Sequence, residues 1–318
     1  MNIVYVYVGN DIPRYGQINI VKTIEKIRDH NFFLLTDSNF NIKIQQSKLK
    51  LVEIQLEPKK ENLSNQLSHD NRFRNGFWTH TLSRFFYLEE FSKIVQEPFI
   101  HVELDVILSK KFPFESFSLI EENLAYPLVS STRGIASVFY VRNTEAISHF
   151  TKFILKKILQ DSTLTDMSLL GSYKNEYPHK VKILPTSIHQ SDRDFTGIFD
   201  GAAIGMYLTG TDPRNFFGIS KIYQTFLDHE INPARNTIEE KNGSIFVGDG
   251  KFISKEIYNL HVHSKQKKYF NDSKHIKKNI VSSQKKYKLK QKIYILVTVK
   301  IILSAIKRRF INLIDHIF

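Results

Sequence analysis

The apolar residues near the start of the chain form short runs separated by a helical pattern. Residues 2–8 and 32–37 are almost continuous apolar runs, and residues 16–30 between them carry isoleucines at helical spacing. Such runs are typical of buried strands, and the spacing between them is typical of a helix that packs on those strands. The order strand, helix, strand predicts a βαβ unit in a parallel sheet, whose ligand crevice lies at the carboxyl ends of the strands.

The same patterns continue to the end of the body of the chain, and we find no internal repeat. No long featureless stretch precedes residue 265, which favours one α/β domain over residues 1–264 with a mixed, mainly parallel central sheet. The further expected elements are strands near residues 49–56, 99–108, 135–141 and 180–185, and helices near residues 77–95, near 144–160 and from 165.

The net charge of +13 is concentrated in the last part of the chain. Residues 265–318 hold 15 of the 45 Lys and Arg residues and two of the 32 acidic residues, so residues 1–264 hold 30 of each and are neutral. A basic excess along the face of a domain is typical of nucleic-acid binding. Here the excess flanks an aliphatic segment instead of an aromatic stacking platform, so we expect no nucleic-acid partner.

The basic tail, residues 265–318, has a polar first part and an apolar second part. Its densest apolar stretch, residues 293–306, has 14 residues interrupted by Lys300 and is too short to span a bilayer. We expect a basic amphipathic helix that lies on an anionic membrane surface. The alternative is a C-terminal helix that packs on the body and exposes a basic face.

Two features of the sequence concern the compartment. The chain contains no cysteine, which fits a reducing environment. Residues 1–10 lack a basic segment and a cleavage site, and they are typical of a first strand instead of a signal peptide. Together with the tail, these features predict a cytoplasmic protein held peripherally at the inner face of the cell membrane.

A pair of carboxylates interrupts the apolar run of residues 99–108. Glu103 and Asp105 are two residues apart, and in an extended segment such residues project from the same face. Mg²⁺ and Mn²⁺ take oxygen ligands and complete their shells with water and substrate phosphates. The pair is therefore a candidate site for a divalent cation that carries a diphosphate; the alternative is a solvated strand end.

A second candidate cluster lies near the end of the body. His261 and His263 are two residues apart in what the pattern predicts to be a short extended segment, and Lys265 follows them. A neutral imidazole can complete a metal shell, and a lysine can neutralise a phosphate. The alternative is a pair of ordinary surface or core histidines.

These motifs, in this order, resemble the retaining type of GT-A glycosyltransferase, and most of all the family-8 enzymes of bacterial surface-polysaccharide, lipopolysaccharide and capsule synthesis. Arg84 resembles the arginine of the helix before the metal motif, and residues 99–108 resemble the strand that holds the DxD motif. Residues 260–265 resemble the late histidine-lysine segment, and residues 165–170 resemble the acidic helix start that lines the sugar pocket. The matched order spans roughly residues 1–270.

The resemblance implies a single GT-A domain that moves a hexose or N-acetylhexosamine from a nucleotide-sugar, typically a UDP-sugar, to a saccharide or lipid-linked saccharide acceptor. It implies Mn²⁺ or Mg²⁺ held by Asp105 and by either His261 or His263, with Glu103 in contact with either the metal or the ribose. The sequence departs from the family pattern at two places. The first acid of the metal motif is Glu103 instead of Asp, and Ser264-Lys265 stands where the family has a Gly-Pro-Lys segment.

The remaining candidates concern the donor and the acceptor. The resemblance implies that Arg84 contacts the nucleotide or donor sugar, that Asp37 lies near the base or ribose, and that Lys265 faces the diphosphate. It also makes Asp166 a catalytic candidate. Asp200 is a second one, because it lies in a segment of glycines and acids that is suited to an acceptor pocket.

Each of these residues also has a structural interpretation. Arg84 is suited to a salt bridge within its helix, and Asp166 to capping the helix that it begins. The glycines around Asp200 are equally suited to tight packing of a helix and a loop.

Two other classes of function use the same features. A metal-dependent phosphoesterase or nucleotidyltransferase would also gather acids around phosphate, but a two-metal site would need a further compact cluster of acids or histidines, and the sequence shows none. A non-catalytic membrane-surface binding protein would use the basic tail alone.

Overall fold

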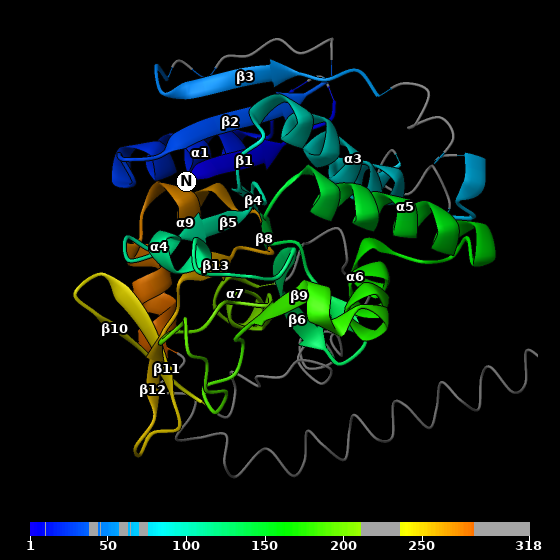
Figure 1. Cartoon of the computed structure of the whole chain (residues 1–318). Coiled ribbons are helices and arrows are strands. Elements are labelled where there is room, and N and C mark those ends of the chain that lie inside the picture. Colours follow the sequence, from blue (N-terminus) through cyan, green and yellow to red (C-terminus); the bar gives the residue numbers. More distant parts are fainter. Residues whose placement is uncertain are drawn as a thin grey trace, which may run out of the picture.

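A mixed sheet forms the centre of the molecule (Figure 1). The structure, a computed structural model, describes residues 1–9, 11–37, 44, 46–56, 63, 65–69, 76–210 and 236–282. In the described residues the strand order is β3-β2-β1-β4-β8-β6-β7, and β9 pairs with β6. The strands are β1 (Asn2–Val6), β2 (Asn31–Thr36), β3 (Leu49–Glu53), β4 (Phe99–Val102), β6 (Leu124–Ser130), β7 (Arg133–Gly134), β8 (Val138–Val141) and β9 (Val181–Leu184).

Most strands of this sheet point the same way. β1 pairs in parallel with both β2 and β4, and β2 pairs in parallel with β3. β8 lies between β4 and β6 and runs antiparallel to both. As a result, β6 and its parallel neighbour β9 run in the same direction as β4. The expected α/β fold with a mixed, mainly parallel sheet is therefore confirmed.

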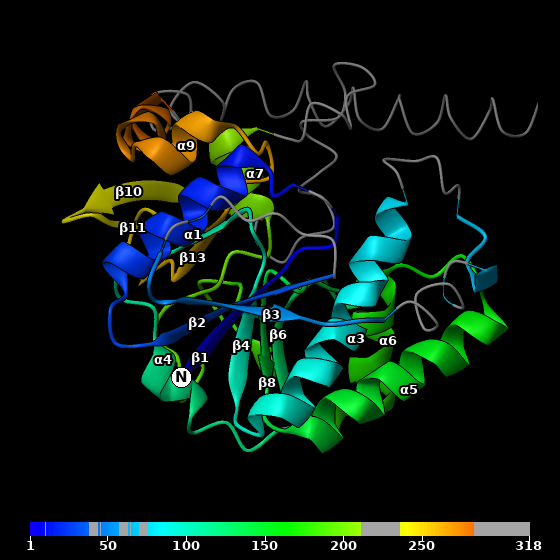
Figure 2. The same cartoon turned by 90° about the horizontal axis from the view of Figure 1, so that it is seen from above.

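Helices cover both faces of the sheet (Figure 2). Alternate residues of β1 point to opposite faces: Ile3 and Tyr5 pack with the isoleucines of α1, whereas Val4 packs with α3, α5 and α6. Burying both faces explains why the strands consist of continuous apolar runs. The helices are α1 (Arg14–Lys26), α3 (Phe77–Val95), α5 (Thr144–Gln160) and α6 (Asp166–Glu176).

Capping side chains fix the starts of two predicted helices. The Ala146 N–H donates to Oδ1 of Asn143 at 2.9 Å, so α5 begins at Thr144. Thr165 and Ser168 form a reciprocal capping box at the start of α6. Asp166 is therefore the first helical residue and not the cap.

The expected strand over residues 99–108 is wrong in one respect, because the chain turns at the acid pair. β4 ends at Val102, and β5 (Val106–Leu108) pairs with β13 (Asn259–His261) in a separate two-stranded sheet. The turn is closed by a hydrogen bond from the N–H of Val106 to the carbonyl of Glu103 at 3.0 Å. Glu103 and Asp105 thus belong to a turn between two sheets instead of one face of a strand.

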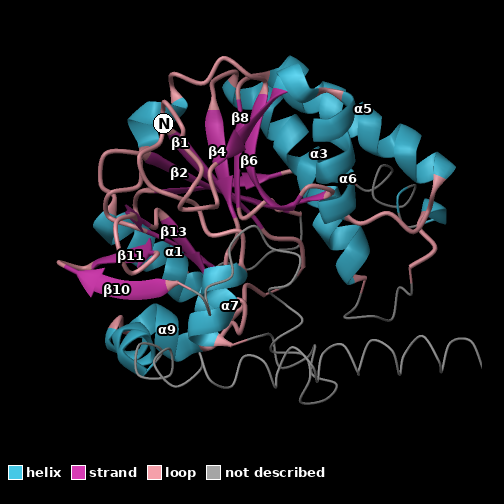
Figure 3. Ribbon diagram, turned by 90° about the horizontal axis from the view of Figure 1, so that it is seen from below, coloured by secondary structure: helices cyan, strands magenta, loops and turns pink. Residues whose placement is uncertain are grey.

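The later elements pack beside α1, on the side of the sheet away from α3 and α5 (Figure 3). A third apolar cluster joins them to β13. They are α7 (Ala203–Thr209), β10 (Thr237–Lys241), β11 (Ser244–Gly248), β12 (Ser254–Glu256), α9 (Lys267–Asn271) and a helix over residues 274–282; two short helices, α4 (Phe114–Phe117) and η1 (Pro178–Lys180), lie earlier in the chain.

The boundary that charge placed at residue 264 does not end the packed body. Tyr269 and Phe270 of α9 are buried, as are Ile276 and Ile280 of the following helix. The ring of Phe270 also lies 5.5 Å from that of Tyr15 of α1. Residues 265–282 are therefore part of the body, and the rest of the predicted tail lies outside the described residues.

None of the helices in the described residues is both long and apolar enough to cross a membrane.

Candidate metal and phosphate site

The turn that carries the acid pair is held from α1. The side-chain amide of Asn19, which is 3% exposed, donates to the carbonyl of Leu104 at 3.1 Å and to that of Val106 at 2.7 Å. The backbone N–H of Glu103 donates to the carbonyl of Ser137 at 3.2 Å. Because both sides of the turn are bonded to neighbouring elements, the two carboxylates have fixed positions.

Glu103, Asp105 and His261 form a compact group. One ligand atom from each of these side chains lies within 4.8 Å of the others. His261 Nε2 is 3.3 Å from Oδ2 of Asp105 and 3.8 Å from Oε2 of Glu103. The antiparallel pairing of β13 with β5 sets His261 opposite Val106, so a residue near the end of the body reaches the turn.

The structure brings only one of the two candidate histidines into this group. The ring of His263 lies 5.9 Å from that of His261, in the turn that follows β13, and among the described residues it is not part of the group. Of the two histidines, the geometry favours His261 as the imidazole of a candidate metal site.

This set of donors fits a divalent cation such as Mn²⁺ or Mg²⁺. Two carboxylates supply hard oxygen atoms, and the imidazole turns Nε2 toward them. In the described part of the chain, no other group of three histidine or acidic side chains has ligand atoms this close together.

Arg84 connects three elements at the edge of this group. Its guanidinium donates to Oε1 of Glu103 through Nη1 and to Oδ2 of Asp166 through Nη2, while Nε donates to the carbonyl of Thr81 at 2.7 Å. The ion pairs join α3 to the acid turn and to α6, so Arg84 does not form a salt bridge within its own helix. Burial raises the pKa of Asp166 by more than the nearby Arg84 guanidinium lowers it, so the pKa of that carboxyl group is raised.

Asp105 lies between two cationic side chains. Lys265 Nζ is 3.3 Å from Oδ2 of Asp105, the same oxygen that His261 approaches. Burial alone would raise the pKa of Asp105, but Lys265 and His261 outweigh it and hold that pKa well below its usual range. Burial alone would lower the pKa of His261, whereas the neighbouring carboxylates raise it to about 9.

Asp200 has a different place from the one expected. Its carboxylate is fully buried, and it accepts hydrogen bonds from the backbone N–H groups of Ile204 at 3.0 Å, Gly205 at 2.8 Å and His261 at 3.0 Å. Through these hydrogen bonds the carboxylate joins α7 to β13. Asp200 is thus placed to position His261, not to face sugar hydroxyl groups.

Asp37 follows β2 at the same edge of the sheet as the acid turn. Its Oδ1 accepts a hydrogen bond from the N–H of Gly9, just after β1, at 3.3 Å. Among the described residues, it is not a member of the metal-ligand group. Its expected place near a base or ribose is compatible with this position at the strand ends.

Sequence reasoning did not identify Asn19. Its signal is a small amide side chain on the otherwise apolar face of the helix predicted over residues 16–30. A buried amide needs partners, and the carbonyl groups of Leu104 and Val106 supply them.

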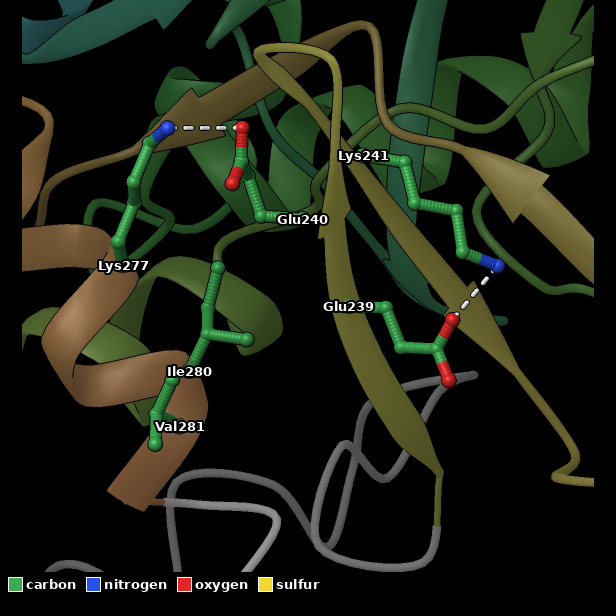
Figure 4. Close-up of a pocket in the computed structure, with 6 residues that line it drawn as sticks. All are labelled: Glu239, Glu240, Lys241, Lys277, Ile280 and Val281. Carbon is green, nitrogen blue, oxygen red and sulfur yellow. Dashed lines mark ion pairs between the residues drawn. The ribbon is translucent and has the colours of Figure 1, made fainter.

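A separate hollow of about 250 Å³ lies between β10 and the helix over residues 274–282 (Figure 4). Both of its acidic side chains form ion pairs with lysines. Oε2 of Glu239 lies 2.6 Å from Nζ of Lys241, and Oε1 of Glu240 lies 3.0 Å from Nζ of Lys277. It shares no residue with the metal-ligand group.

No family model and no curated protein sequence matches the chain. The fold is similar to solved structures of glycosyltransferases. The galactosyltransferase LgtC in complex with donor and acceptor sugar analogues has 10% identity and a TM-score of 0.45, with 73% of this chain and 84% of that chain covered. Mouse xyloside xylosyltransferase 1 has 11% identity and a TM-score of 0.41, with 58% of this chain and 86% of that chain covered. The glycosyltransferase GlyE of Streptococcus pneumoniae TIGR4 has 14% identity and a TM-score of 0.37, with 57% of this chain and 44% of that chain covered.

Proposed function

We propose that this protein is a metal-assisted glycosyltransferase that moves a hexose or N-acetylhexosamine from a nucleotide-sugar, a UDP-sugar by the motif resemblance, to a saccharide acceptor. The observation that carries the proposal is the group of Glu103, Asp105 and His261, with Lys265 beside it, at the carboxyl ends of the sheet strands. Two acids, an imidazole and a lysine at such an edge suit a diphosphate that binds together with a cation.

The reaction releases a nucleoside diphosphate and one proton. The bond between the anomeric carbon and the diphosphate oxygen breaks, and the acceptor hydroxyl oxygen bonds to that carbon. A divalent cation held by Glu103, Asp105 and His261 would neutralise charge on the departing diphosphate. Lys265 supplies a further positive charge beside the same position, which favours the leaving group.

Arg84 and Asp166 are proposed to bind the transferred sugar. Their ion pair holds both side chains at the edge of the metal-ligand group, and Asp166 comes from the start of α6. A planar guanidinium can donate to phosphate and hydroxyl oxygens while it retains a carboxylate partner. The orientation of Arg84 then depends on Glu103 and Asp166 together.

The acceptor and location are proposed from sequence. The motif resemblance supports a saccharide or lipid-linked saccharide in bacterial surface-polysaccharide synthesis. The basic charge of residues 265–318 supports attachment to an anionic membrane surface at the inner face of the cell membrane. The exposed lysines of residues 265–282 contribute to that charge.

The first test is thermal unfolding of the protein with a panel of nucleotide-sugars and nucleoside diphosphates, with and without Mn²⁺. A ligand at 100 times its Kd stabilises the folded state by about 2.7 kcal/mol, which raises the midpoint by several degrees. We expect a Mn²⁺-dependent increase for one nucleotide-sugar that Asp105→Asn abolishes.

The matched control is Glu115→Gln, which removes an exposed carboxylate of α4 and should keep the increase. Incubating the identified donor with acceptor sugars then separates the classes: a transferase forms a glycoside and a nucleoside diphosphate, whereas a phosphoesterase that hydrolyses the diphosphate linkage releases a nucleoside monophosphate and a sugar phosphate. No stabilisation by any nucleotide in a folded protein would contradict the proposal.

A further inference from the structure

Lys265 occupies a position that a metal ion would need. Its Nζ and Nε2 of His261 both lie 3.3 Å from the same oxygen, Oδ2 of Asp105. The Asp105 side chain is 9% exposed, so few directions of approach to that oxygen remain. A cation that binds Asp105 through this oxygen therefore meets the ammonium group of Lys265.

The backbone presents Lys265 in an unusual conformation. Its φ is +56°, in the left-handed region that non-glycine residues rarely adopt, and its N–H donates to the carbonyl of Val262 at 2.9 Å. For a lysine this conformation is less favourable than the right-handed region. The tight turn after β13 thus directs a long cationic side chain back toward the acid turn.

The carboxylates of the site already have positively charged partners. Arg84 binds Glu103 and Asp166, and Lys265 lies beside Asp105. A divalent ion that arrives alone adds two positive charges next to these two cations in a largely buried group, which is unfavourable at low effective dielectric. A diphosphate that arrives with the ion supplies the missing negative charge.

We propose that Lys265 holds the metal position at Asp105 in the nucleotide-free protein and transfers to the diphosphate when metal and nucleotide bind together. The inference rests on the proposed function. Lysine suits this exchange because its ammonium group ends a flexible four-carbon chain and donates equally well to carboxylate and phosphate oxygens. Metal and nucleoside diphosphate then bind cooperatively, and Lys265 is the residue that couples them.

The test is Mn²⁺ binding followed by electron paramagnetic resonance, with and without UDP, in the wild-type protein and Lys265→Met. Removing the competing ammonium group should strengthen binding of Mn²⁺ alone about tenfold, which corresponds to about 1.4 kcal/mol. The increase in Mn²⁺ affinity that UDP produces in the wild-type protein should shrink in the variant, because the coupling residue is gone. A role of Lys265 in phosphate binding alone would leave the affinity for Mn²⁺ alone unchanged.

Three variants control the test. Lys265→Gly also removes the ammonium group and relieves the positive φ, so it should show the same tighter Mn²⁺ binding in a protein with an unstrained turn. Lys265→Arg keeps the charge and should keep weak binding of Mn²⁺ alone. Lys267→Met removes a neighbouring exposed lysine and should behave as wild type.

The outcomes separate the two proposals. If Mn²⁺ with UDP binds the wild-type protein but both Lys265→Met and Lys265→Gly bind Mn²⁺ alone no more tightly, the exchange is wrong and the proposed function stands. If neither Mn²⁺ nor UDP binds the wild-type protein or the variants in any combination, both proposals are wrong.

Discussion

Asn19 is the residue on which the geometry of the acid turn depends. Asn19→Leu keeps the size of the side chain but leaves the carbonyls of Leu104 and Val106 without their donor. Buried carbonyls without partners cost about 1–3 kcal/mol, so we expect the free energy of unfolding to fall by about 2 kcal/mol. Urea unfolding measures that loss, and a weaker Mn²⁺ affinity of the folded variant would show that the turn has moved.

The control for this prediction is Asn175→Leu, at an exposed position near the end of α6. It should change stability by no more than about 0.5 kcal/mol. If both asparagine variants lose the same small amount, the two bonds of Asn19 do not hold the turn.

Single residues also show what the sequence predicted about the site. Glu103, Asp105 and His261 were candidates because two nearby carboxylates can share a cation and an imidazole can complete its shell, and the structure brings the three side chains together. Asp200 was assigned to an acceptor pocket because an acid among glycines has the same appearance whether it binds sugar hydroxyls or backbone N–H groups. Its partner His261 lies 61 residues away, and no local pattern reports that contact.

At the scale of elements, the contact between α7 and β13 sets the position of His261. A Cβ atom at Gly205 would lie 1.8 Å from the carbonyl oxygen of His261, so Gly205→Ala must push the helix and the strand apart. We expect a loss of about 3 kcal/mol of stability, at the upper end for overpacking, together with weaker Mn²⁺ binding. Thermal unfolding and Mn²⁺ titration of the same sample measure the two effects.

Gly201→Ala is the graded control for this contact. Its Cβ would meet its nearest atom, the carbonyl oxygen of Leu128, at 3.2 Å, so a small adjustment is enough. We expect a smaller loss of stability than for Gly205→Ala and an unchanged Mn²⁺ affinity. Equal effects of the two substitutions on Mn²⁺ binding would mean that the α7 contact does not position His261.

The elements that sequence predicted best are those whose signals are local. The helices over residues 77–95 and 144–160 have apolar faces wide enough to identify them, and Asn143 marks the start of the second. The turn between β4 and β5 has no glycine or proline and lies inside an apolar run, so the pattern predicts one strand. The break in this predicted strand depends on hydrogen bonds to Asn19 and Ser137, which are distant in sequence.

At the scale of the whole molecule, charge and packing divide the chain at different places. The composition changes from neutral to basic at residue 265. In residues 265–282, however, the apolar side chains face the third apolar cluster while lysines such as Lys267, Lys274 and Lys278 are exposed. The net charge of this segment depends on its lysines and does not report which apolar side chains are buried. A boundary drawn from charge therefore fell inside a packed region.

Two truncated chains separate the structural part of this basic region from its proposed membrane part. A chain that ends at Ser282 keeps α9 and the helix after it, and we expect it to keep its unfolding midpoint and Mn²⁺ binding. A chain that ends at Ser264 loses the buried side chains of Tyr269, Phe270 and Ile276, each worth about 1.5–3 kcal/mol, and should be severely destabilised.

Cosedimentation with anionic vesicles completes this prediction. The full chain should bind in a salt-sensitive manner, because basic residues near an anionic surface are attracted by a potential that salt screens. The chain that ends at Ser282 should be released, since it lacks nine of the 15 basic residues of the tail and all of the apolar stretch over residues 293–306. Vesicle binding that survives this truncation would instead assign the membrane contact to the exposed lysines of the folded body, and would make attachment and catalysis properties of one unit.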